Sequence, residues 1–572
     1  MNKYTHIFKA IYPVLFILLI TSCEEFLEEI PRDRLTSANF FNNSEELGYA
    51  MNGLFNHASD QFNQSTFVIP GCGSDQLCAT NLHPEKLPFR EFDRYNISGI
   101  NKRMVRIWQV FYQLIRDCNW LYDKADQVPT TEGVKTLVKG QTRFLKAWAY
   151  FYLVRLWGNI PVNDRYDGLL EGVYMGTPEQ VYTLINEYLD EAETALPMNW
   201  TESEITAMYG SDTWQDLPSF WKGEGDRATL KGHGNRALPT LGWAKALRAE
   251  VYLNMAGWPL KQTDKYALSA QAAKDVIDNA ATYGYGLMED YQELWLFDKD
   301  FNKEEIIIFG FDRDGNSNSV GTGLKPWDEY ESTWANGWGD CGVEAQYFLK
   351  FPESYRKKVS IISSWYLQKD FNKSTNEPRF SPSNYVSWEN SAAKMPWIAK
   401  WRNTEDFPYD STYASVLYSG SRAIHALRYA HVLLTYAEAK SMSDGPDALA
   451  YECVNQIRRR AYKLPLDVPS AYDLQTGLSA EQFRDSVVQE RNYEFIGEME
   501  NRWYDLQRLE MIEEIAEDIQ AWRDANPDYI NPHIGNITRI PTKEDGYWLP
   551  YPSTEVDRAP DLFGPYLIGG NK

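Results

Sequence analysis

Three glutamates that recur at every fourth position are the residues of this chain most similar to an acid–base catalytic set. Glu490, Glu494 and Glu498 lie in the segment ERNYEFIGE. Paired carboxylates hydrolyse glycosidic bonds only when they flank the scissile bond, and spacing along one helix does not provide that arrangement. Side chains four positions apart on a helix do lie close enough for ion pairs. We therefore expect these glutamates to pair with arginines inside a helical body, and we predict no catalytic residues.

The segment Asp312 to Asn318, DRDGNSN, begins like a calcium-binding loop. Such a loop has glycine at position six and a bidentate glutamate at position twelve. Those positions here hold Ser317 and Gly323, so a turn is the expected structure and we predict no metal site and no cofactor. The chain also has no glycine-rich phosphate loop, Ser-His-Asp signature or His-x-x-x-His pair. A glycan-degrading enzyme stays an alternative, because the two acids of a glycosidase have no local signature.

Aromatic residues make up 15% of the chain, with 20 tryptophans. A neutral polysaccharide is bound mainly by flat aromatic faces that stack on sugar rings, with amide, carboxylate or guanidinium groups on the hydroxyls. Tryptophans outside helical periodicity are the candidates for this role, and we expect them to be more exposed than those within it. They are Trp200, Trp214, Trp221, Trp295, Trp327, Trp334, Trp338, Trp365, Trp388, Trp397 and Trp401.

The best candidate window is Pro326 to Gly342, PWDEYESTWANGWGDCG, which shows neither helical nor strand periodicity. We predict Trp334 and Trp338 as the main stacking platforms, with Trp327 and Tyr330 as further contacts. The alternative is that these rings pack into a small core of their own, since large aromatic side chains are usually mostly buried.

A second window runs from Phe89 to Asn101, and in it Tyr95 and Asn96 are predicted to face the same cleft. An asparagine amide both donates to and accepts from a hydroxyl group, which suits a sugar. A purely structural role in a turn is the favoured alternative for Asn96.

The N-terminus has the pattern of a lipoprotein signal. Lys3 and Lys9 precede a short apolar run that ends in Ile20-Thr-Ser-Cys-Glu-Glu25, which resembles a lipobox. The run is too short to cross a hydrocarbon layer, which takes about 20 helical residues. We therefore predict that residues 1–22 are a signal peptide and that Cys23 carries the lipid anchor.

The net charge and the number of cysteines limit the possible partners and the possible disulfides. Without residues 1–22, which hold two lysines and no acidic residue, the formal charge changes from −23 to −25. Such an acidic surface disfavours nucleic acid as a partner. Five cysteines follow Cys23, so at least one is unpaired. Cys72 and Cys78 are close enough in sequence for a disulfide, but isolated buried thiols are at least as consistent with the pattern.

Helical periodicity dominates both ends of the chain. Thr177-Pro178 is a helix start, and Gly158 to Pro161 ends the helix before it. Many of the predicted helices come in pairs, and small and large residues alternate along them. This pattern is typical of tetratricopeptide-type hairpins. Segments 59–102, 197–238 and 312–420 are too long for plain connections, so we expect them to be functional or to pack as a subdomain. The helices are predicted at 103–126, 178–196, 239–256, 262–281, 447–462, 479–498 and 500–523, with Ile424, Leu427, Ala430, Leu434 and Ala437 on one face of another.

A series of motifs in order resembles the SusD/RagB family of outer-membrane lipoproteins of Bacteroidota. The tail WLPYPSTEV and the block LRYAHVLLTYAEA are two of them. His431 and Tyr551 depart from the family pattern, which has Glu and Ile there. The full set is Cys23–Pro31 with Leu35-Thr36 and Phe40-Phe41, Trp108–Asn119, Arg143–Pro161, Leu427–Ala439, Asn455–Arg460, Glu490–Arg508 and the tail.

The resemblance implies a mainly α fold, with a tetratricopeptide-like helical scaffold and an irregular, loop-rich ligand-binding region. Residues 23–572 would form one SusD-like domain, with the scaffold at about 23–300 and 421–572 and the insertion at about 312–420. The implied function is capture of an extracellular oligosaccharide or polysaccharide and its delivery to a TonB-dependent, SusC-like barrel transporter.

The implied location is the outer membrane, with the lipid-anchored chain facing the medium, as Glu24 and Glu25 after the anchor suggest. Capture of a peptide or glycopeptide, as in the RagB branch, is the main alternative. A purely structural lid on the transporter is another.

Overall fold

The computed structural model describes most of the chain after residue 39. The described residues are 40–80, 83–223, 229–230, 234–311, 318–324, 338–366, 371–372, 377–378, 385–401, 422–500, 502–531, 534, 536–545 and 547–566. The predicted lipidation site Cys23, the start of the calcium-like segment and most of the Pro326–Gly342 window lie outside these ranges.

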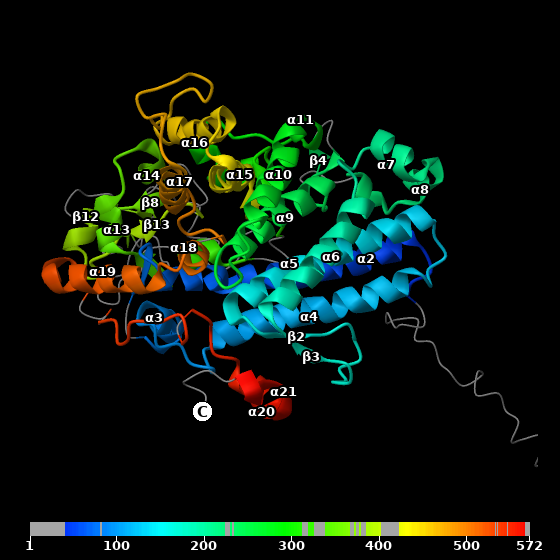
Figure 1. Cartoon of the computed structure of the whole chain (residues 1–572), viewed down its shortest axis with the longest axis horizontal. Helices are drawn as coiled ribbons and strands as arrows, with labels where there is room; N and C mark the ends of the chain where they lie inside the picture. The colour runs from blue at the N-terminus through cyan, green and yellow to red at the C-terminus, as the bar shows by residue number, and fades with distance from the viewer. Residues whose placement is uncertain are drawn as a thin grey trace, which may run out of the picture.

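The fold is mainly α, as predicted (Figure 1). Long helices pack side by side in a continuous series: α4 contacts α5, α5 contacts α6, α6 contacts α9, α9 contacts α10, and α10 contacts α15. The long helices are α2 (Ser44–Ser59), α4 (Lys102–Ala125), α5 (Glu132–Trp157), α6 (Pro178–Ala195), α9 (Leu241–Ala256), α10 (Lys265–Asp278), α15 (Tyr429–Asp444), α16 (Ala448–Ala461), α17 (Ala480–Glu494) and α19 (Ile512–Ala525).

Shorter helices connect and flank this array. They are α3 (Leu87–Asp93), α7 (Glu202–Tyr209), α8 (Ser211–Asp216), α11 (Ala280–Tyr283), α12 (Val320–Gly323), α13 (Ala345–Lys350), α14 (Tyr355–Ser360), α18 (Arg502–Arg508), α20 (Ser553–Arg558) and α21 (Pro560–Phe563). Helix starts follow the capping chemistry of the sequence. The side chain of Thr177 accepts a hydrogen bond from the backbone N–H of Gln180, and the Gln180 side chain accepts one from the N–H of Thr177.

The strands are short and pair two by two. The pairs are β1 (Leu77–Ala79) with β7 (Cys341–Val343), β2 (Ile160–Val162) with β3 (Tyr174–Gly176), β4 (Thr229–Leu230) with β5 (Gly234–Asn235), β6 (Glu305–Phe309) with β14 (Ile424–Arg428), β8 (Ile361–Ile362) with β13 (Trp397–Ile398), β9 (Ser364–Tyr366) with β12 (Tyr385–Ser387), and β10 (Phe371–Asn372) with β11 (Glu377–Pro378).

Two helix predictions were wrong in detail. The segment from Ile424 is not helical throughout, because residues up to Arg428 form β14 and only Tyr429 begins α15. Its strand partner β6 is far away in the sequence, so local periodicity could not reveal it. The predicted helix 500–523 is broken into α18 and α19, and Glu510 between them has a positive φ of 60°.

The loop-rich insertion forms a small core of its own in its described part. Trp365, Trp388 and Trp397 pack there with Ile362 and Met395. This core includes a residue from each end of the chain, Cys78 and Ile534, so the insertion is packed against the rest of the molecule. A packed subdomain was one of the two outcomes expected for this region.

The three glutamates of the ERNYEFIGE segment are buried in ion pairs, as predicted. Glu494 lies 2.9 Å from Arg428 and 2.8 Å from Arg460, and Glu498 lies 2.5 Å from Lys400. Glu490 lies 2.7 Å from Arg356 and 3.1 Å from Arg458. Helix α17 ends at Glu494, so Glu498 reaches the network from the turn beyond it.

The five cysteines after Cys23 are all free and buried. Of the two possibilities left open for Cys72 and Cys78, isolated thiols are therefore the one found. Burial raises the pKa of the Cys78 thiol well above its ordinary value, which keeps it protonated. Within the described ranges, none of the helices combines the length and apolar composition that crossing a membrane requires.

Candidate functional site

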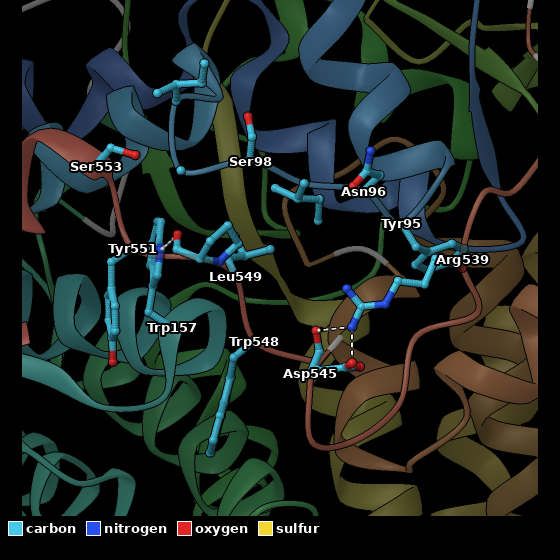
Figure 2. Close-up of a pocket in the computed structure, with 14 residues that line it drawn as sticks. Tyr95, Asn96, Ser98, Trp157, Arg539, Asp545, Trp548, Leu549, Tyr551 and Ser553 are labelled. Atoms are coloured by element: carbon cyan, nitrogen blue, oxygen red, sulfur yellow. Dashed lines mark hydrogen bonds and ion pairs between the residues drawn. The ribbon is translucent and has the colours of Figure 1, made fainter. Parts of the chain in front are cut away.

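A pocket of about 360 Å³ lies at the surface between three segments that are distant in the sequence (Figure 2). The first segment is the loop from Tyr95 to Ile100, between α3 and α4. The second is the end of α5, which contributes Trp157. The third is the C-terminal stretch from Arg539 to Ser553.

Glu91, in α3, holds the first loop in place. Its carboxylate accepts hydrogen bonds from the N–H and hydroxyl of Ser98, at 3.3 and 3.0 Å, and from the amide of Asn101, at 2.7 Å. Its backbone carbonyl accepts from the N–H of Asn96 at 2.8 Å. Asn101 in turn caps α4 by accepting from two backbone N–H groups of its first turn. The loop is therefore fixed between two helices.

The C-terminal stretch is fastened to α5 and to this loop by hydrogen bonds that its backbone makes. The N–H of Leu549 donates to the carbonyl of Leu156 at 2.8 Å, and the indole N–H of Trp157 donates to the carbonyl of Pro550 at 3.0 Å. The N–H of Ser553 donates to the carbonyl of Gly99 at 2.9 Å. A Cβ atom at Gly99 would lie only 2.6 Å from the carbonyl oxygen of Tyr551, so this close approach requires glycine.

Trp548 provides the accessible aromatic surface of the pocket. Its ring packs against Trp258, with the centroids 4.6 Å apart, and lies so close to Gly158 that a Cβ there would be 2.5 Å from the indole. The side chain is only half-buried. Trp157 and Tyr551 also line the pocket but are buried, so Trp548 has the largest ring surface open to a ligand.

An exposed amide and an ion pair are among the polar groups that line the pocket. Asn96 is exposed, and its side chain makes no hydrogen bond to the other residues that the structure describes. Arg539 is paired with Asp545, as Figure 2 shows. Partial burial disfavours the charge of Asp545, but hydrogen bonds from Thr542 and the charge of Arg539 outweigh it and lower the pKa of this carboxyl group. Asp545 is therefore ionised at neutral pH.

Tyr95 and Asn96, both predicted as ligand contacts, line this pocket with different degrees of exposure. The Tyr95 ring is 7% exposed, and its hydroxyl donates to the carbonyl of Gly73 at 2.8 Å. Burial raises the pKa of Tyr95 far above its ordinary value, so the hydroxyl stays neutral. Tyr95 has a positive φ of 50°, which turns the chain and carries Asn96 to the surface.

Of the four predicted ligand contacts in the Pro326–Gly342 window, Trp338 is the one that the structure describes, and it is half-buried. The next two residues are fixed: the carbonyl of Gly339 accepts from the Thr80 hydroxyl at 2.7 Å, and Asp340 pairs with Lys86 at 2.5 Å. Lys86 directly precedes α3, whereas Asn96 follows the other end of that helix. Trp327, Tyr330 and Trp334 lie outside the described residues.

The expectation that tryptophans in irregular segments are exposed was wrong for most of them. Trp338 and Trp214 are half-buried, but seven of the group are at most 3% exposed. These seven are Trp200, Trp221, Trp295, Trp365, Trp388, Trp397 and Trp401. They pack into cores built from segments that are distant in the sequence. Local periodicity cannot predict such contacts.

The sequence did not single out Trp548, Arg539 or Asp545. Trp548 stands in the tail motif WLPYPSTEV, which was used only to recognise the scaffold. It lies outside helical periodicity, which is the signal that would have placed it among the candidate stacking residues. Arg539 and Asp545 carry no local pattern, and only the fold brings them beside Asn96.

Two family models match the chain. One describes the SusD family and matches residues 303–563, and the other is described as starch-binding associating with outer membrane and matches residues 25–210. A SusD-like protein, P2, of Formosa agariphila is 24% identical over 545 residues, which cover 92% of this chain and 96% of that protein.

Solved structures of the same fold resemble the chain over nearly its whole length. A SusD homologue from Bacteroides thetaiotaomicron has a TM-score of 0.70 at 21% identity and covers 91% of this chain and 97% of its own. A laminarin-binding SusD-like protein has a TM-score of 0.63 at 20% identity and covers 90% of this chain and 98% of its own. The chain belongs to the SusD/RagB family.

Proposed function

We propose that this protein binds an extracellular oligosaccharide or polysaccharide without chemically changing it. The observation that supports this most is the pocket that the accessible Trp548 ring lines together with the exposed amide of Asn96 and the Arg539–Asp545 pair. An aromatic face stacks on the apolar face of a sugar ring, while an amide and an ion pair donate to and accept from its hydroxyl groups. The pocket thus offers both kinds of contact that a neutral sugar needs.

Trp338, with Trp334, Trp327 and Tyr330 of the same window, is proposed as a second contact area. Asp340, two residues after Trp338, pairs with Lys86 just before α3, and Asn96 lies just after the other end of that helix. The helix has seven residues and is about 10 Å long, so we propose that one polysaccharide chain contacts both areas. Because the pocket beside Asn96 is small and lies at the surface, we expect modest affinity.

Binding is favoured over hydrolysis by the carboxylates. Of the described residues that line the pocket, Asp545 is the one acidic side chain, whereas glycoside hydrolysis by the usual mechanism takes two. Glu490, Glu494 and Glu498 are at most 2% exposed and are held in ion pairs, so they are not accessible to a polysaccharide.

The proposed location is the outer membrane, with lipid on Cys23 as the anchor and the described body facing the medium. The lipobox-like sequence and the outer-membrane description of the matching family model support this. The laminarin-binding neighbour of the same fold supports a glycan as ligand. Delivery of the captured glycan to a TonB-dependent transporter completes the proposal, on the basis of family membership.

Native gel electrophoresis with a polysaccharide in the gel tests the proposal. The purified chain from residue 24 onward is run in gels containing laminarin, xyloglucan or starch. We expect at least one of them to retard it, and we expect Trp548→Ala and Trp338→Ala each to weaken the retardation. Thermal unfolding of the variants separates loss of binding from loss of folding.

Incubation with the same polysaccharides, followed by an assay for reducing ends, provides the second readout. We expect no new reducing ends. Retardation by none of the polysaccharides, or release of new reducing ends, would contradict binding without chemistry. Full retardation of both tryptophan variants would place the glycan elsewhere on the molecule.

A further inference from the structure

Two groups of buried ion pairs connect α3 with β7, one at each end of the helix. Lys86, directly before α3, lies 2.5 Å from Asp340, directly before β7. Asp93, the last residue of α3, and Glu344, directly after β7, both pair with Arg523 of α19, at 2.7 and 2.8 Å. We refer to these five residues as the α3–β7 clamp.

The two elements that the clamp joins lead directly to the two proposed glycan contact areas. Asn96 is three positions after Asp93, and its backbone N–H donates to the carbonyl of Glu91 in α3 at 2.8 Å. Trp338 is two positions before Asp340. The clamp therefore fixes the separation of the two areas, whereas other contacts determine the shape of each one.

Arg523 holds its two carboxylates with a single nitrogen atom. Its Nη2 donates to Oδ1 of Asp93 and to Oε2 of Glu344. Its Nε and Nη1 have no hydrogen-bond partner among the residues that the structure describes. A lysine ammonium group, which is a compact charge with several donors, can make the same two contacts.

The positive charge of Arg523 keeps the two carboxylates together. Burial raises the pKa of the Asp93 carboxyl group to about 6, although the charge of Arg523 lowers it. Without the arginine, the carboxylates of Asp93 and Glu344 would repel each other, or one of them would take up a proton and lose its charge. In either case the ionic connection at this end of α3 is lost.

Helix α19, which carries Arg523, is itself fixed on both sides of the clamp (Figure 1). Asp518 of α19 accepts a hydrogen bond from the amide of Gln346 in α13, the helix that follows β7, at 2.8 Å. On the side of α3, Arg94 donates to the carbonyl of Ile534, in the segment after α19, at 2.8 Å. Arg523 is therefore held in a defined position between the two elements.

We propose that Arg523 is a positioning residue for glycan binding, which fixes the separation at which one glycan chain contacts both areas. The inference rests on the proposed function, in which Asn96 and Trp338 belong to two areas contacted by one chain. Two linked contacts strengthen binding only when their geometry allows both to form at once. The effect of Arg523 on affinity should therefore depend on the length of the ligand.

Titration calorimetry with a disaccharide and an octasaccharide tests this dependence. Both are prepared from laminarin, xyloglucan or starch, whichever retards the chain in gels. We expect Arg523→Gln to weaken octasaccharide binding at least about tenfold and to change disaccharide binding less than about twofold, because only the longer ligand needs both areas. Arg523→Lys should restore most of the octasaccharide affinity.

Arg459→Gln is the matched control for the loss of a buried arginine. Arg459 is also paired with two carboxylates, Glu452 and Asp473, and Figure 1 shows its helix, α16, on the opposite side of the molecule from α3. We expect thermal unfolding at a lower temperature in this variant and unchanged binding of both ligands. Glu344→Gln removes the charged connection to β7 but leaves Arg523 paired with Asp93. It should reproduce the effect of Arg523→Gln, and it replaces that variant if Arg523→Gln does not fold.

Spin labels on Asn96→Cys and Trp338→Cys test the clamp without a ligand. The five native cysteines after Cys23 are buried, so the labels attach to the two new thiols. Dipolar spectroscopy should give one narrow distance distribution between the labels. This distribution should broaden or shift with Arg523→Gln, and it should not change with Arg459→Gln.

Four outcomes would overturn the proposal. They are an equal loss of both ligands in Arg523→Gln, no loss of the octasaccharide, the same loss in Arg459→Gln, or a label distance that does not depend on Arg523. Failure of every glycan to bind the unmodified chain would contradict the proposed function and this inference with it. Glycan binding that does not depend on Arg523 would contradict the inference alone.

Discussion

At the scale of single residues, the proposed sugar contact depends most on Asn96. Its backbone N–H is held by the carbonyl of Glu91, while its side-chain amide is free among the described residues. Tyr95, its neighbour, is fixed by burial and by its hydrogen bond to Gly73. The fold depends on the Tyr95 side chain but not on the Asn96 side chain. Substitution of Asn96 therefore tests binding with little effect on folding.

We predict that Asn96→Ala weakens the affinity for the retarding oligosaccharide by about 1–2 kcal/mol, roughly tenfold, since a hydrogen-bonding group is lost from the site. Titration calorimetry measures this. Asn52→Ala, at an exposed position of α2, is the matched control and should bind as the unmodified chain does. Equal affinities of the two variants would remove Asn96 from the site.

At the scale of elements, the pocket depends on how the C-terminal stretch lies on α5 and on the loop before α4. Backbone hydrogen bonds at Leu549 and Ser553 fix that stretch, and glycines at positions 99 and 158 permit its close approach. The site is therefore assembled from elements that are 393 positions apart (Leu156 and Leu549) and 454 positions apart (Gly99 and Ser553) in the sequence.

We predict that Gly99→Ala lowers the free energy of unfolding by about 1–3 kcal/mol and also weakens glycan binding, because the new methyl group would push Tyr551 and Ser553 away. Gly53→Ala, inside α2 where a Cβ meets no atom within 4 Å, should instead stabilise the protein by about 0.5–1 kcal/mol. Urea unfolding and titration of both variants check this. A neutral effect of Gly99→Ala on both quantities would contradict the described packing.

The sequence predicted the helices better than it predicted the site, for a physical reason. Helices such as α6 are determined locally, since Thr177, Pro178 and the apolar spacing that follows are all within one segment. Strand β14 and the burial of Trp397 depend on partners far away in the sequence, β6 and β8. The same holds for the pocket, since Asn96 was predicted but Trp548 was not.

At the scale of the whole molecule, a buried ion-pair network joins segments that lie between residues 304 and 498. Arg428 lies 2.6 Å from Glu304 and 2.8 Å from Glu498, and Arg356 lies 2.8 Å from Glu494. These residues come from the segment before β6, from β14, from α14 and from α17 and the turn after it. Buried pairs of this kind cost much to break, because the remaining charge loses its partner without regaining water.

Glu494 makes this network sensitive to acid. Burial disfavours its charge, but Arg460, Arg428 and Arg356 outweigh burial and lower the pKa of Glu494 to about 2, from an ordinary value of 4.5. Its stabilising contribution, about 3 kcal/mol, is therefore complete above pH 4.5 and is lost as the pH falls towards 2.

We predict that the free energy of unfolding, measured with urea at a series of pH values, falls between pH 4.5 and 2. Glu494→Gln should lower it by about 3–5 kcal/mol at neutral pH and should flatten this dependence. The exposed Glu202→Gln serves as the control and should change neither. An equally steep acid dependence in Glu494→Gln would show that other carboxylates determine it.

A crystal structure of the complex would show whether this molecule binds a glycan in the pocket between its N-terminal and C-terminal segments. The chain from residue 24 onward would be crystallised with an oligosaccharide of the polysaccharide that retards it in gels. We predict a sugar ring against Trp548, with a hydroxyl group within hydrogen-bond distance of the Asn96 amide. An ordered oligosaccharide bound elsewhere, with this pocket containing only water, would show that the pocket is not the glycan site.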